Sequence, residues 1–452
     1  WLKQPEHLVV PAFSQAMLQN CKGLLAGVLA CNRASRKLSV FVARRAVASG
    51  QAHGLMRIPR ISIERFRHGT HQERDAEVIA VRAAFENHGM ALLADTGIPR
   101  SVVQACTERS REFFSLPRGR KEQFGMPGGY PPRSYCPITY PRGKAYEVQQ
   151  EAHGAIVNEW LLVRDSDKPF DARDQYYTSE EGREFFTPEG SHPEQQVWPE
   201  EVPGLQEATS AYCRHVNHLA TTMYEVFSLA LGLSCDFFTS RARRVPTWPV
   251  TIAHYPKQLV PPPEGTMRIQ PHWDRTLFAL VTTQDLDEQT LGGGLQILVD
   301  RTTGCAADGR NIDDAEWRSV AIEPDCFVLN VGEQMARWTN GRFKHVVHRV
   351  PNPSPAMATT VKHGRISIMA YVSPDYDTPV ECLPSCLEAS GGVAKYEPTW
   401  VGEMLNWNSN LPIYDKAKQE RMRMAQGLYN AAGSQTTLGT PTDVNSVMSS
   451  ST

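Results

Sequence analysis

Residues 329–350 read LNVGEQMARWTNGRFKHVVHRV, between PHWD at residues 271–274 and RISIMAYV at residues 365–372. Short runs of β-branched and aromatic residues, broken by Pro and Gly, fill this part of the chain: 251–255, 277–282, 295–299, 326–331, 346–350 and 366–372. Asn340-Gly341 is a strong turn signal between two of these runs. Short strands at this spacing predict a β-sandwich, barrel or jelly roll.

A long helix is predicted on the N-terminal side of these strands. Apolar residues recur at spacings of three and four from Leu205 to Ala230, which is typical of an amphipathic helix that ends near Gly232. His215 and His218 lie three residues apart on this helix. Because no third ligand is suggested nearby, we interpret them as partly exposed helix residues rather than as metal ligands.

Residues 58–125 predict an α/β lead-in to this helix. They combine a β-like start at 58–63, helical stretches at 76–85 and 101–114, and an apolar run at 90–94. Residues 160–163 are a further strand candidate, within a region of polar, Pro-rich and Gly-rich loops.

Composition excludes several classes of protein. The 452 residues carry 47 Lys plus Arg against 49 Asp plus Glu, so there is no global positive field to bind nucleic acid. No apolar run approaches the roughly 18 residues of a membrane span. The ten cysteines include no C-x-x-C pair, which disfavours a disulfide scaffold or zinc ribbon and favours a reducing compartment. Walker, G-x-G-x-x-G and G-x-S-x-G motifs are absent from the sequence.

Both ends of the chain differ in composition from its middle. Between Glu6 and Glu64 there is no acidic residue but eight Lys or Arg, which fits either an organelle transit peptide or a disordered basic arm. The expected location is accordingly the cytoplasm or, with a transit peptide, a plastid or mitochondrion. Residues 433–452 contain ten Ser or Thr and one charge, and they predict a flexible tail.

His272-Trp273-Asp274 is the sole H-x-D in the chain. On a strand, residues i and i+2 face the same way, so the imidazole and the carboxylate would point inward together and Trp273 outward. Two His and one carboxylate on a single face suit a redox iron, because they leave positions open for other ligands. His345 and His348, three apart, would face opposite sides of one strand, and we favour His348 because it lies mid-run among valines.

A second pair suits an anion. Arg365-Ile366-Ser367 places a guanidinium and a hydroxyl on one strand face, which fits a carboxylate. An Arg within an apolar run is costly unless an anion meets it. The spacing alone leaves two partners open for Arg365, a bound ligand or an internal Asp or Glu.

With these motifs in place, the chain resembles the isopenicillin N synthase-like branch of iron and 2-oxoglutarate-dependent dioxygenases over residues 58–425. Further similar stretches are IPRISI (58–63), FENHGMALLADTGIP (85–99), REFFSLPRGRK (111–121), NEWLLV (158–163), ALGLSCDFF (230–238), GLQIL (294–298) and KYEPTWVGEML (395–405). The resemblance implies a mainly β fold with α, a double-stranded β-helix (jelly roll) enclosing the iron. It divides the chain into a basic extension (1–57), an N-terminal dioxygenase region (58–200), the long helix plus catalytic domain (201–425) and a Ser/Thr-rich tail (426–452).

The resemblance also implies the site residues. It assigns Fe(II) to His272, Asp274 and His348, and the distal carboxylate of 2-oxoglutarate to Arg365 and Ser367.

Tyr255, in AHYP, matches the tyrosine of the family's Asn-x-Tyr-Pro motif, which also contacts the co-substrate. Here the chain departs from the family, because Ala253 replaces the Asn. Residues 300–317 look like an insertion, and the interval between His348 and Arg365 is longer than usual.

The activity implied is oxidation of a small organic metabolite, for instance one of secondary metabolism, with 2-oxoglutarate and O2 as co-substrates and succinate and CO2 as products. Hydroxylation, desaturation and cyclisation are all compatible with it, as is use of ascorbate. We expect a monomer with a small-molecule substrate, no nucleic acid partner and no membrane span. Arg275, Phe278 and residues 126–142 are substrate-pocket candidates by position only.

Three alternatives stay open at this point. A same-fold iron oxidase that does not use 2-oxoglutarate would keep the Arg-x-Ser pair for another carboxylate. A non-catalytic metal-binding β-barrel would not need that pair. A zinc hydrolase usually adds a carboxylate base beside its ligands, and the sequence suggests none.

Overall fold

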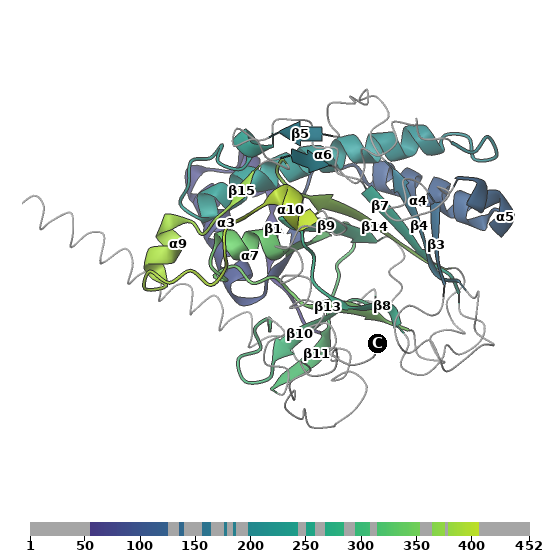
Figure 1. Cartoon of the computed structure of the whole chain (residues 1–452). Coiled ribbons are helices and arrows are strands. Elements are labelled where there is room, and N and C mark those ends of the chain that lie inside the picture. Colours follow the sequence, from purple (N-terminus) through teal and green to yellow (C-terminus); the bar gives the residue numbers. More distant parts are fainter. Residues whose placement is uncertain are drawn as a thin grey trace, which may run out of the picture. The chain divides into compact units, whose positions relative to one another are not determined.

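Two β-sheets face each other in the described chain, and helices cover the outer face of the larger sheet (Figure 1). The computed structural model describes residues 55–124, 135–139, 156–163, 176–178, 184–186, 198–242, 250–257, 267–283, 294–307, 314–352, 364–375 and 378–405. The chain divides into two units, and all described residues belong to the second, which begins at Gly54. The predicted basic extension and Ser/Thr-rich tail lie outside the described residues, apart from residues 55–57.

The larger sheet has eight strands in the order β1-β2-β12-β9-β14-β7-β4-β3, antiparallel except for the parallel pair β1 and β2. Its strands are β1 (Arg60–Ser62), β2 (Met90–Ala94), β3 (Tyr135–Thr139), β4 (Ile156–Val163), β7 (Val250–Tyr255), β9 (Phe278–Thr283), β12 (Phe327–Val331) and β14 (Arg365–Val372).

The smaller sheet is antiparallel, in the order β11-β10-β13-β8. Its strands are β8 (Met267–His272), β10 (Gln296–Asp300), β11 (Ala315–Ser319) and β13 (His348–Pro351). Two short ribbons complete the described strands: β5 (Tyr176–Thr178) with β6 (Glu184–Phe186), and β15 (Pro379–Val380) with β16 (Thr399–Trp400).

The helices are α2 (Ile63–His68), α3 (His71–Asn87), α4 (Arg100–Ser115), α5 (Arg118–Lys121), α6 (Leu205–Ala230), α7 (Glu333–Trp338), α9 (Pro384–Ala389) and α10 (Val401–Leu405), with 3-10 turns η1 (Glu122–Phe124) and η6 (Thr239–Arg241). The predicted long helix is confirmed as α6, which packs against α3 and α4. It ends at Ala230, and Gly232, two residues later, has a φ of 74° that lets the amide of Leu233 donate to the carbonyl of Ser228 at 2.9 Å.

Alternation along β12 separates the two cores. Phe327 and Leu329 join the large apolar cluster between the helices and the larger sheet. Val328, on the other face, joins a second cluster with residues of the smaller sheet such as Ile297 and Val299. The larger sheet is therefore covered on both faces, and its inner face is the wall of the space between the sheets.

Most predicted elements are confirmed, with boundaries shifted by a few residues. Each of the six predicted β runs overlaps a strand, and residues 90–94, which the sequence marked only as an apolar run, form β2. Five of the described helices were not predicted: α2, α5, α7, α9 and α10. Of these, α2 directly follows β1, and α7 occupies residues 333–338, within the stretch 329–350.

The predicted turn at Asn340-Gly341 exists. It does not directly join two strands, however, which differs from the prediction. Asn340 and Gly341 have φ of 53° and 78°, and the turn follows α7 rather than a strand. An extended segment then leads to β13, which begins only at His348. Much of the suspected insertion at residues 300–317 is the hairpin between β10 and β11, and its residues 308–313 lie outside the described part.

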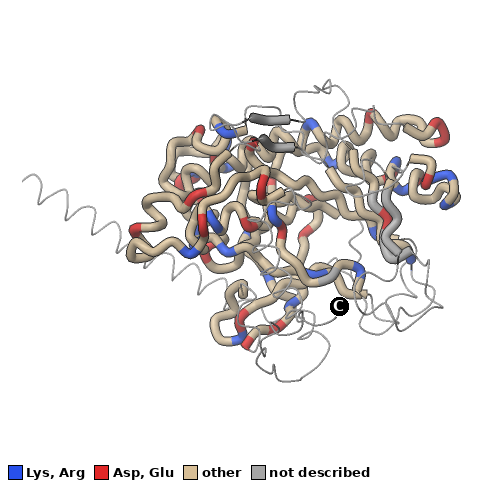
Figure 2. Tube along the Cα trace, viewed as in Figure 1, with Lys and Arg blue, Asp and Glu red and all other residues tan. Residues whose placement is uncertain are grey.

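Charge is spread over the described chain, where basic and acidic positions are interspersed rather than gathered in regions of one sign (Figure 2). Among the described helices, none combines the length and apolarity needed to span a bilayer.

Candidate metal and co-substrate site

A pocket lies between the inner faces of the two sheets, with about 660 Å³ of empty space including the part open to solvent. All six residues predicted for the site line it: His272, Asp274 and His348, called here the His-Asp-His triad, and Tyr255, Arg365 and Ser367, called here the Arg-Ser-Tyr trio. Much of the remaining wall is apolar, with Met90, Val281, Leu295, Ile322 and Val328. The structure therefore brings the two predicted sets together.

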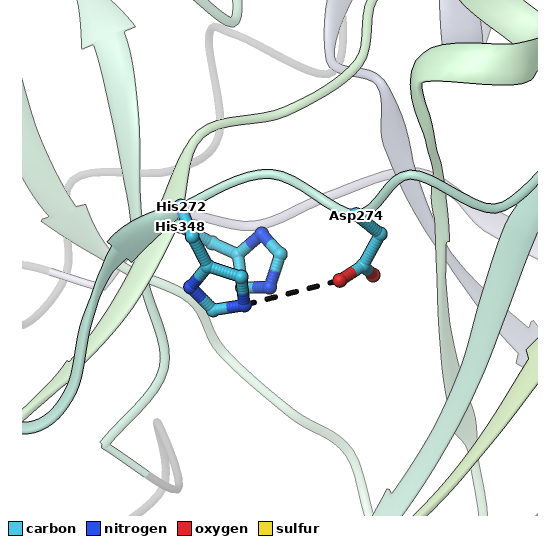
Figure 3. A group of neighbouring side chains, drawn as sticks. All are labelled: His272, Asp274 and His348. Carbon is cyan, nitrogen blue, oxygen red and sulfur yellow. Dashed lines mark ion pairs between the residues drawn. The ribbon is translucent and has the colours of Figure 1, made fainter. Parts of the chain in front are cut away.

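The His-Asp-His triad is held by the smaller sheet and the loop that follows β8 (Figure 3). His272 is the last residue of β8 and pairs across the sheet with His348, the first residue of β13. Their ring centroids are 4.2 Å apart, and Nε2 of His272 lies 3.8 Å from Oδ1 of Asp274. One ligand atom from each of the three residues lies within 4.8 Å of the others.

Two details of the predicted geometry are wrong. Asp274 is not on the strand with His272, because β8 ends at His272 and Asp274 lies in the loop that follows. His348 does not lie in the middle of a strand, because it is the first residue of β13 and Val346 and Val347 precede that strand. The triad forms nevertheless, since the carboxylate of Asp274 still lies next to the paired imidazoles, with Oδ1 3.8 Å from Nε2 of His272.

Two hydrogen bonds orient the triad. Nδ1 of His348 lies 3.1 Å from the carbonyl oxygen of Val346, which can only accept, so the proton belongs on Nδ1 and the lone pair on Nε2. The buried side chain of Asn330, on β12, donates to Oδ2 of Asp274 at 2.7 Å. This bond occupies one carboxylate oxygen and leaves Oδ1 on the side of His272. Asn330 was missed at the sequence level, because one Asn within an apolar strand carries no signal of its own.

His345, the rejected alternative to His348, lies elsewhere. Its buried ring packs 5.6 Å from the ring of Trp273, centroid to centroid. The indole Nε1 of Trp273 in turn donates to Glu333 at 3.3 Å. These contacts place His345 behind the H-x-D segment, outside the pocket lining.

The donor set fits a redox-active divalent metal. Two imidazole nitrogens and one carboxylate oxygen converge from one side, which leaves the pocket side for other ligands, as in the two-His-one-carboxylate sites of non-haem iron oxygenases. Within the described residues it is the one group of three or more His, Cys, Asp or Glu with such spacing. His215 and His218 of α6 are not part of this group, in agreement with their interpretation as helix residues rather than metal ligands.

The Arg-Ser-Tyr trio belongs to the larger sheet. Arg365 and Ser367 alternate along β14 toward the pocket, and Arg365 pairs with Tyr255 of β7. The guanidinium carbon of Arg365 lies 4.4 Å from the centroid of the Tyr255 ring. Burial raises the pKa of Tyr255, although the charges of Arg365 and Arg268 oppose this shift, so the phenol stays neutral.

Thr283 adds a hydroxyl that sequence reasoning missed. It pairs with Ser367 across β9 and β14, lines the pocket, and donates to the carbonyl of Ile366 at 2.8 Å. Its lone pairs remain on the pocket wall beside Ser367. Thr is common in strands, so the sequence offers no reason to single it out.

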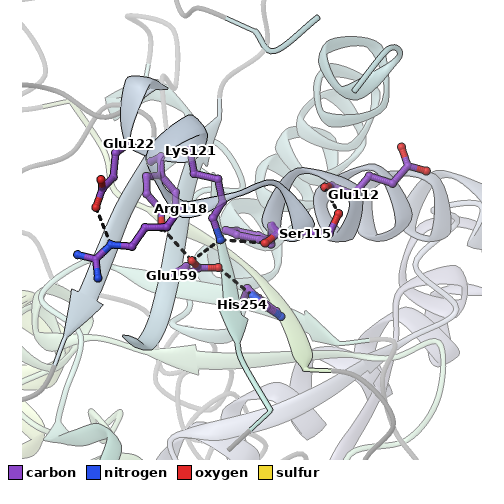
Figure 4. A network of polar contacts seen from close by, with 9 residues as sticks. Glu112, Ser115, Arg118, Lys121, Glu122, Glu159 and His254 are labelled. Atoms are coloured by element: carbon purple, nitrogen blue, oxygen red, sulfur yellow. Dashed lines mark hydrogen bonds and ion pairs between the residues drawn. The ribbon is translucent and has the colours of Figure 1, made fainter. Parts of the chain in front are cut away.

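A buried polar network lies on the opposite face of β7 (Figure 4). Glu159 of β4 pairs across the sheet with His254 and accepts from Lys121, from Tyr135 at 2.8 Å and from Nδ1 of His254 at 3.1 Å. Burial alone would raise the pKa of Glu159, but the hydrogen bonds from His254 and Lys121 outweigh it and leave the pKa below its usual value. The network thus ties α5, β3 and β4 to the residue next to Tyr255.

Two family models match the chain over most of its described length. Residues 247–374 match the 2OG-Fe(II) oxygenase superfamily, and residues 58–201 match the non-haem dioxygenase in morphine synthesis N-terminal model. The first range contains every residue of the triad and the trio.

Curated relatives and solved structures agree with these matches. The chain is 26% identical to validamycin A dioxygenase of Streptomyces hygroscopicus subsp. limoneus, covering 74% of this chain and 81% of that protein. It is also 26% identical to flavonol synthase/flavanone 3-hydroxylase of Matthiola incana, covering 72% and 90%.

Among solved structures, a 2OG-Fe(II) oxygenase family protein from Caulobacter crescentus superposes with a TM-score of 0.57 at 22% identity, covering 81% of this chain and 98% of that one. Neurospora crassa T7H in complex with alpha-KG gives a TM-score of 0.58 at 19% identity, covering 78% and 96%. These likenesses confirm the double-stranded β-helix fold, here as two separate sheets rather than a closed barrel. The chain belongs to the 2OG-Fe(II) oxygenase superfamily and is an iron- and 2-oxoglutarate-dependent dioxygenase, consistent with the isopenicillin N synthase-like branch.

Proposed function

We propose that the His-Asp-His triad holds the Fe(II) of this dioxygenase and that the Arg-Ser-Tyr trio binds the distal carboxylate of 2-oxoglutarate. The observation that carries this proposal is that both sets line one pocket between the sheets. A 2-oxo acid long enough to reach both would be chelated at one end and paired with a guanidinium at the other.

When bound, iron with 2-oxoglutarate supplies oxidising power from O2, as the co-substrate is converted to succinate and CO2 and a substrate C–H bond is oxidised. The chain's own residues would bind the metal and the co-substrate and orient them. Asn330 and the carbonyl of Val346 fix the directions of Asp274 and His348. Arg365 supplies a cation in a fork that suits a carboxylate, and Ser367 a hydroxyl.

Apolar side chains of both sheets line the space beside the triad: Met90, Val281 and Val328 of the larger sheet, and Ile269 and Val350 of the smaller. Such a wall protects a reactive centre from side reactions with solvent.

The substrate proposed is a small organic metabolite, which is hydroxylated, desaturated or cyclised. Relatives are named for compounds as different as validamycin A, flavanones and hyoscyamine, so these names have oxidation of an organic compound in common rather than one substrate. The near-balanced charge of the chain, −2 overall, supports a small molecule over a nucleic acid.

The test uses anaerobic protein loaded with Fe(II), to which 2-oxoglutarate is added while the visible spectrum is recorded. A weak charge-transfer band of the iron chelate is expected, together with succinate release on admission of air. Iron binding without the band would overturn the assignment of a 2-oxoglutarate site. It would favour the alternative of a same-fold iron oxidase that does not use 2-oxoglutarate.

Two variants separate the roles of the two sets. Arg365→Met should raise the Kd for 2-oxoglutarate at least about tenfold while iron binding is kept, since a charge-assisted pair is lost. Arg349→Met is the matched control, because Arg349 stacks at 4.1 Å over Trp317 in the same molecule and lies outside the pocket lining. Loss of iron in Arg365→Met would show that the roles are wrongly assigned.

A further inference from the structure

Arg268 connects the two sheets beside the trio. It lies on β8 four residues before His272, and its side chain is buried, with 7% of its surface exposed. Its Nη2 donates a hydrogen bond to the carbonyl of Pro256, the residue that follows β7. A side chain of the metal-bearing sheet thus holds the end of a strand in the opposite sheet.

The same guanidinium also lies against Tyr255. Its carbon is 6.0 Å from the centroid of the Tyr255 ring, where that of Arg365 is 4.4 Å away. Both distances are within the range of cation–π attraction, which is strengthened when the partners are buried. Tyr255 is 5% exposed, so its ring has little freedom once these contacts form.

We propose that Arg268 is a positioning residue for 2-oxoglutarate, which acts through Tyr255 and the backbone at Pro256. It holds the phenol beside Arg365 so that both meet the distal carboxylate in one arrangement. The inference rests on the proposed function, because it presumes that Arg365 and Tyr255 bind this carboxylate. It goes further by making a residue of the smaller sheet, which does not line the pocket, responsible for co-substrate affinity.

The proposed role predicts which ligands need Arg268 for tight binding. A residue that arranges the distal-carboxylate end affects 2-oxoglutarate but not 2-oxopentanoate, which has the same chain length and no distal carboxylate. A merely structural residue would weaken both ligands alike, and iron with them.

The experiment is a titration of anaerobic Fe(II)-loaded protein with each of these two acids, followed by the chelate band. Arg268→Met keeps an unbranched apolar stem and removes the guanidinium, with its charge and its donors. The Kd for 2-oxoglutarate is expected to rise about tenfold, on the order of the loss of one charge-assisted hydrogen bond and one cation–π contact, and the Kd for 2-oxopentanoate to change less than about twofold. In turnover, KM for 2-oxoglutarate should rise with kcat largely kept.

Arg268→Lys should recover part of the affinity, because it restores the charge and a donor but not the planar group. Arg349→Met, with a half-buried Arg on the same sheet, should leave both Kd values unchanged. Equal loss for the two acids, or no loss in Arg268→Met, would overturn the proposal. Absence of any 2-oxoglutarate band in the unsubstituted protein would instead overturn the proposed function, so the two failures are distinguishable.

Should Arg268→Met not fold, Arg268→Gln provides the second variant, since it retains an amide donor for the Pro256 carbonyl without the charge. Its expected selectivity between the two acids is the same.

Discussion

The side-chain amide of Asn330 donates to Oδ2 of Asp274 across 2.7 Å, from a strand of the larger sheet to the loop that completes the triad. Both side chains are buried, with 3% and 8% of their surfaces exposed. The bond fixes which carboxylate oxygen faces His272, so the orientation of the Asp274 carboxylate depends on a residue outside the triad.

Replacing Asn330 should therefore weaken metal binding without removing a ligand. Asn330→Leu has a similar volume and no donor, and we expect the affinity for Fe(II) or Co(II) to fall about 10- to 100-fold. Calorimetric titration of the anaerobic protein measures this. An affinity within twofold of the unsubstituted protein would show that Asp274 keeps its aim unaided.

His348 and His345 offer a matched pair of substitutions. His348→Ala should abolish stoichiometric metal binding, because only two ligands remain. His345→Ala should retain it, since that ring packs on Trp273 outside the pocket. Metal content after dialysis distinguishes the two, and a metal-free His345→Ala protein that is still folded would reverse the assignment.

Gly364 allows β14 to approach β7 closely. A Cβ at this position would lie 2.6 Å from the carbonyl oxygen of Tyr255 and 2.3 Å from Nε2 of His254. Gly364→Ala should push Arg365 away from Tyr255, cost about 1–3 kcal/mol in the free energy of unfolding and raise the Kd for 2-oxoglutarate. Gly119→Ala is the control, since nothing lies within 4 Å of its Cβ. Similar results for both variants would contradict this account.

The Glu159 network predicts a pH dependence of stability. The pKa of Glu159 is lowered in the folded protein from the usual 4.5, so its contribution is present above about pH 4.5 and is lost as the pH falls through the folded value. Glu159→Gln leaves Lys121 buried without its carboxylate, which should cost about 3–5 kcal/mol near neutral pH.

Denaturant unfolding of both proteins between pH 7 and pH 3 tests this. The difference in free energy should be constant down to about pH 5 and shrink below pH 4.5, because the carboxyl group of the unfolded chain is protonated there while the native carboxylate is still ionised. It is lost once the pH falls below the pKa of Glu159 in the folded protein. If the difference in free energy of unfolding between the two proteins grew on acidification, the prediction would be contradicted.

The sequence predicted elements best where apolar pattern and boundary signals coincide. Leu205–Ala230 carries an apolar stripe that ends just before Gly232, and it forms α6 as predicted. The six residues of α7 are too few to show a helical period, so this helix was missed. The H-x-D spacing indicated two residues that do lie together with His348, but for a partly wrong reason, because the strand ends at His272.

Residues that act across the fold could not be predicted from the sequence. Asn330, Thr283 and Arg268 gain their roles only when two sheets or two distant strands meet, over 56 residues of chain in the case of Asn330 and Asp274. Each looks ordinary in its own segment. The residues of the triad and the trio could be predicted because they stand in short sequence motifs. That both sets line one pocket could be learned only from the structure.

The triad belongs to the smaller sheet and its loop, while the trio belongs to the larger sheet. A chelated co-substrate would accordingly fasten one sheet to the other, as a removable cross-link between two halves of a sandwich. By mass action, iron and 2-oxoglutarate together should then protect the protein against heat and proteolysis more than the sum of their separate effects. Protection of that kind would make co-substrate supply a determinant of how long the protein survives, independent of any turnover.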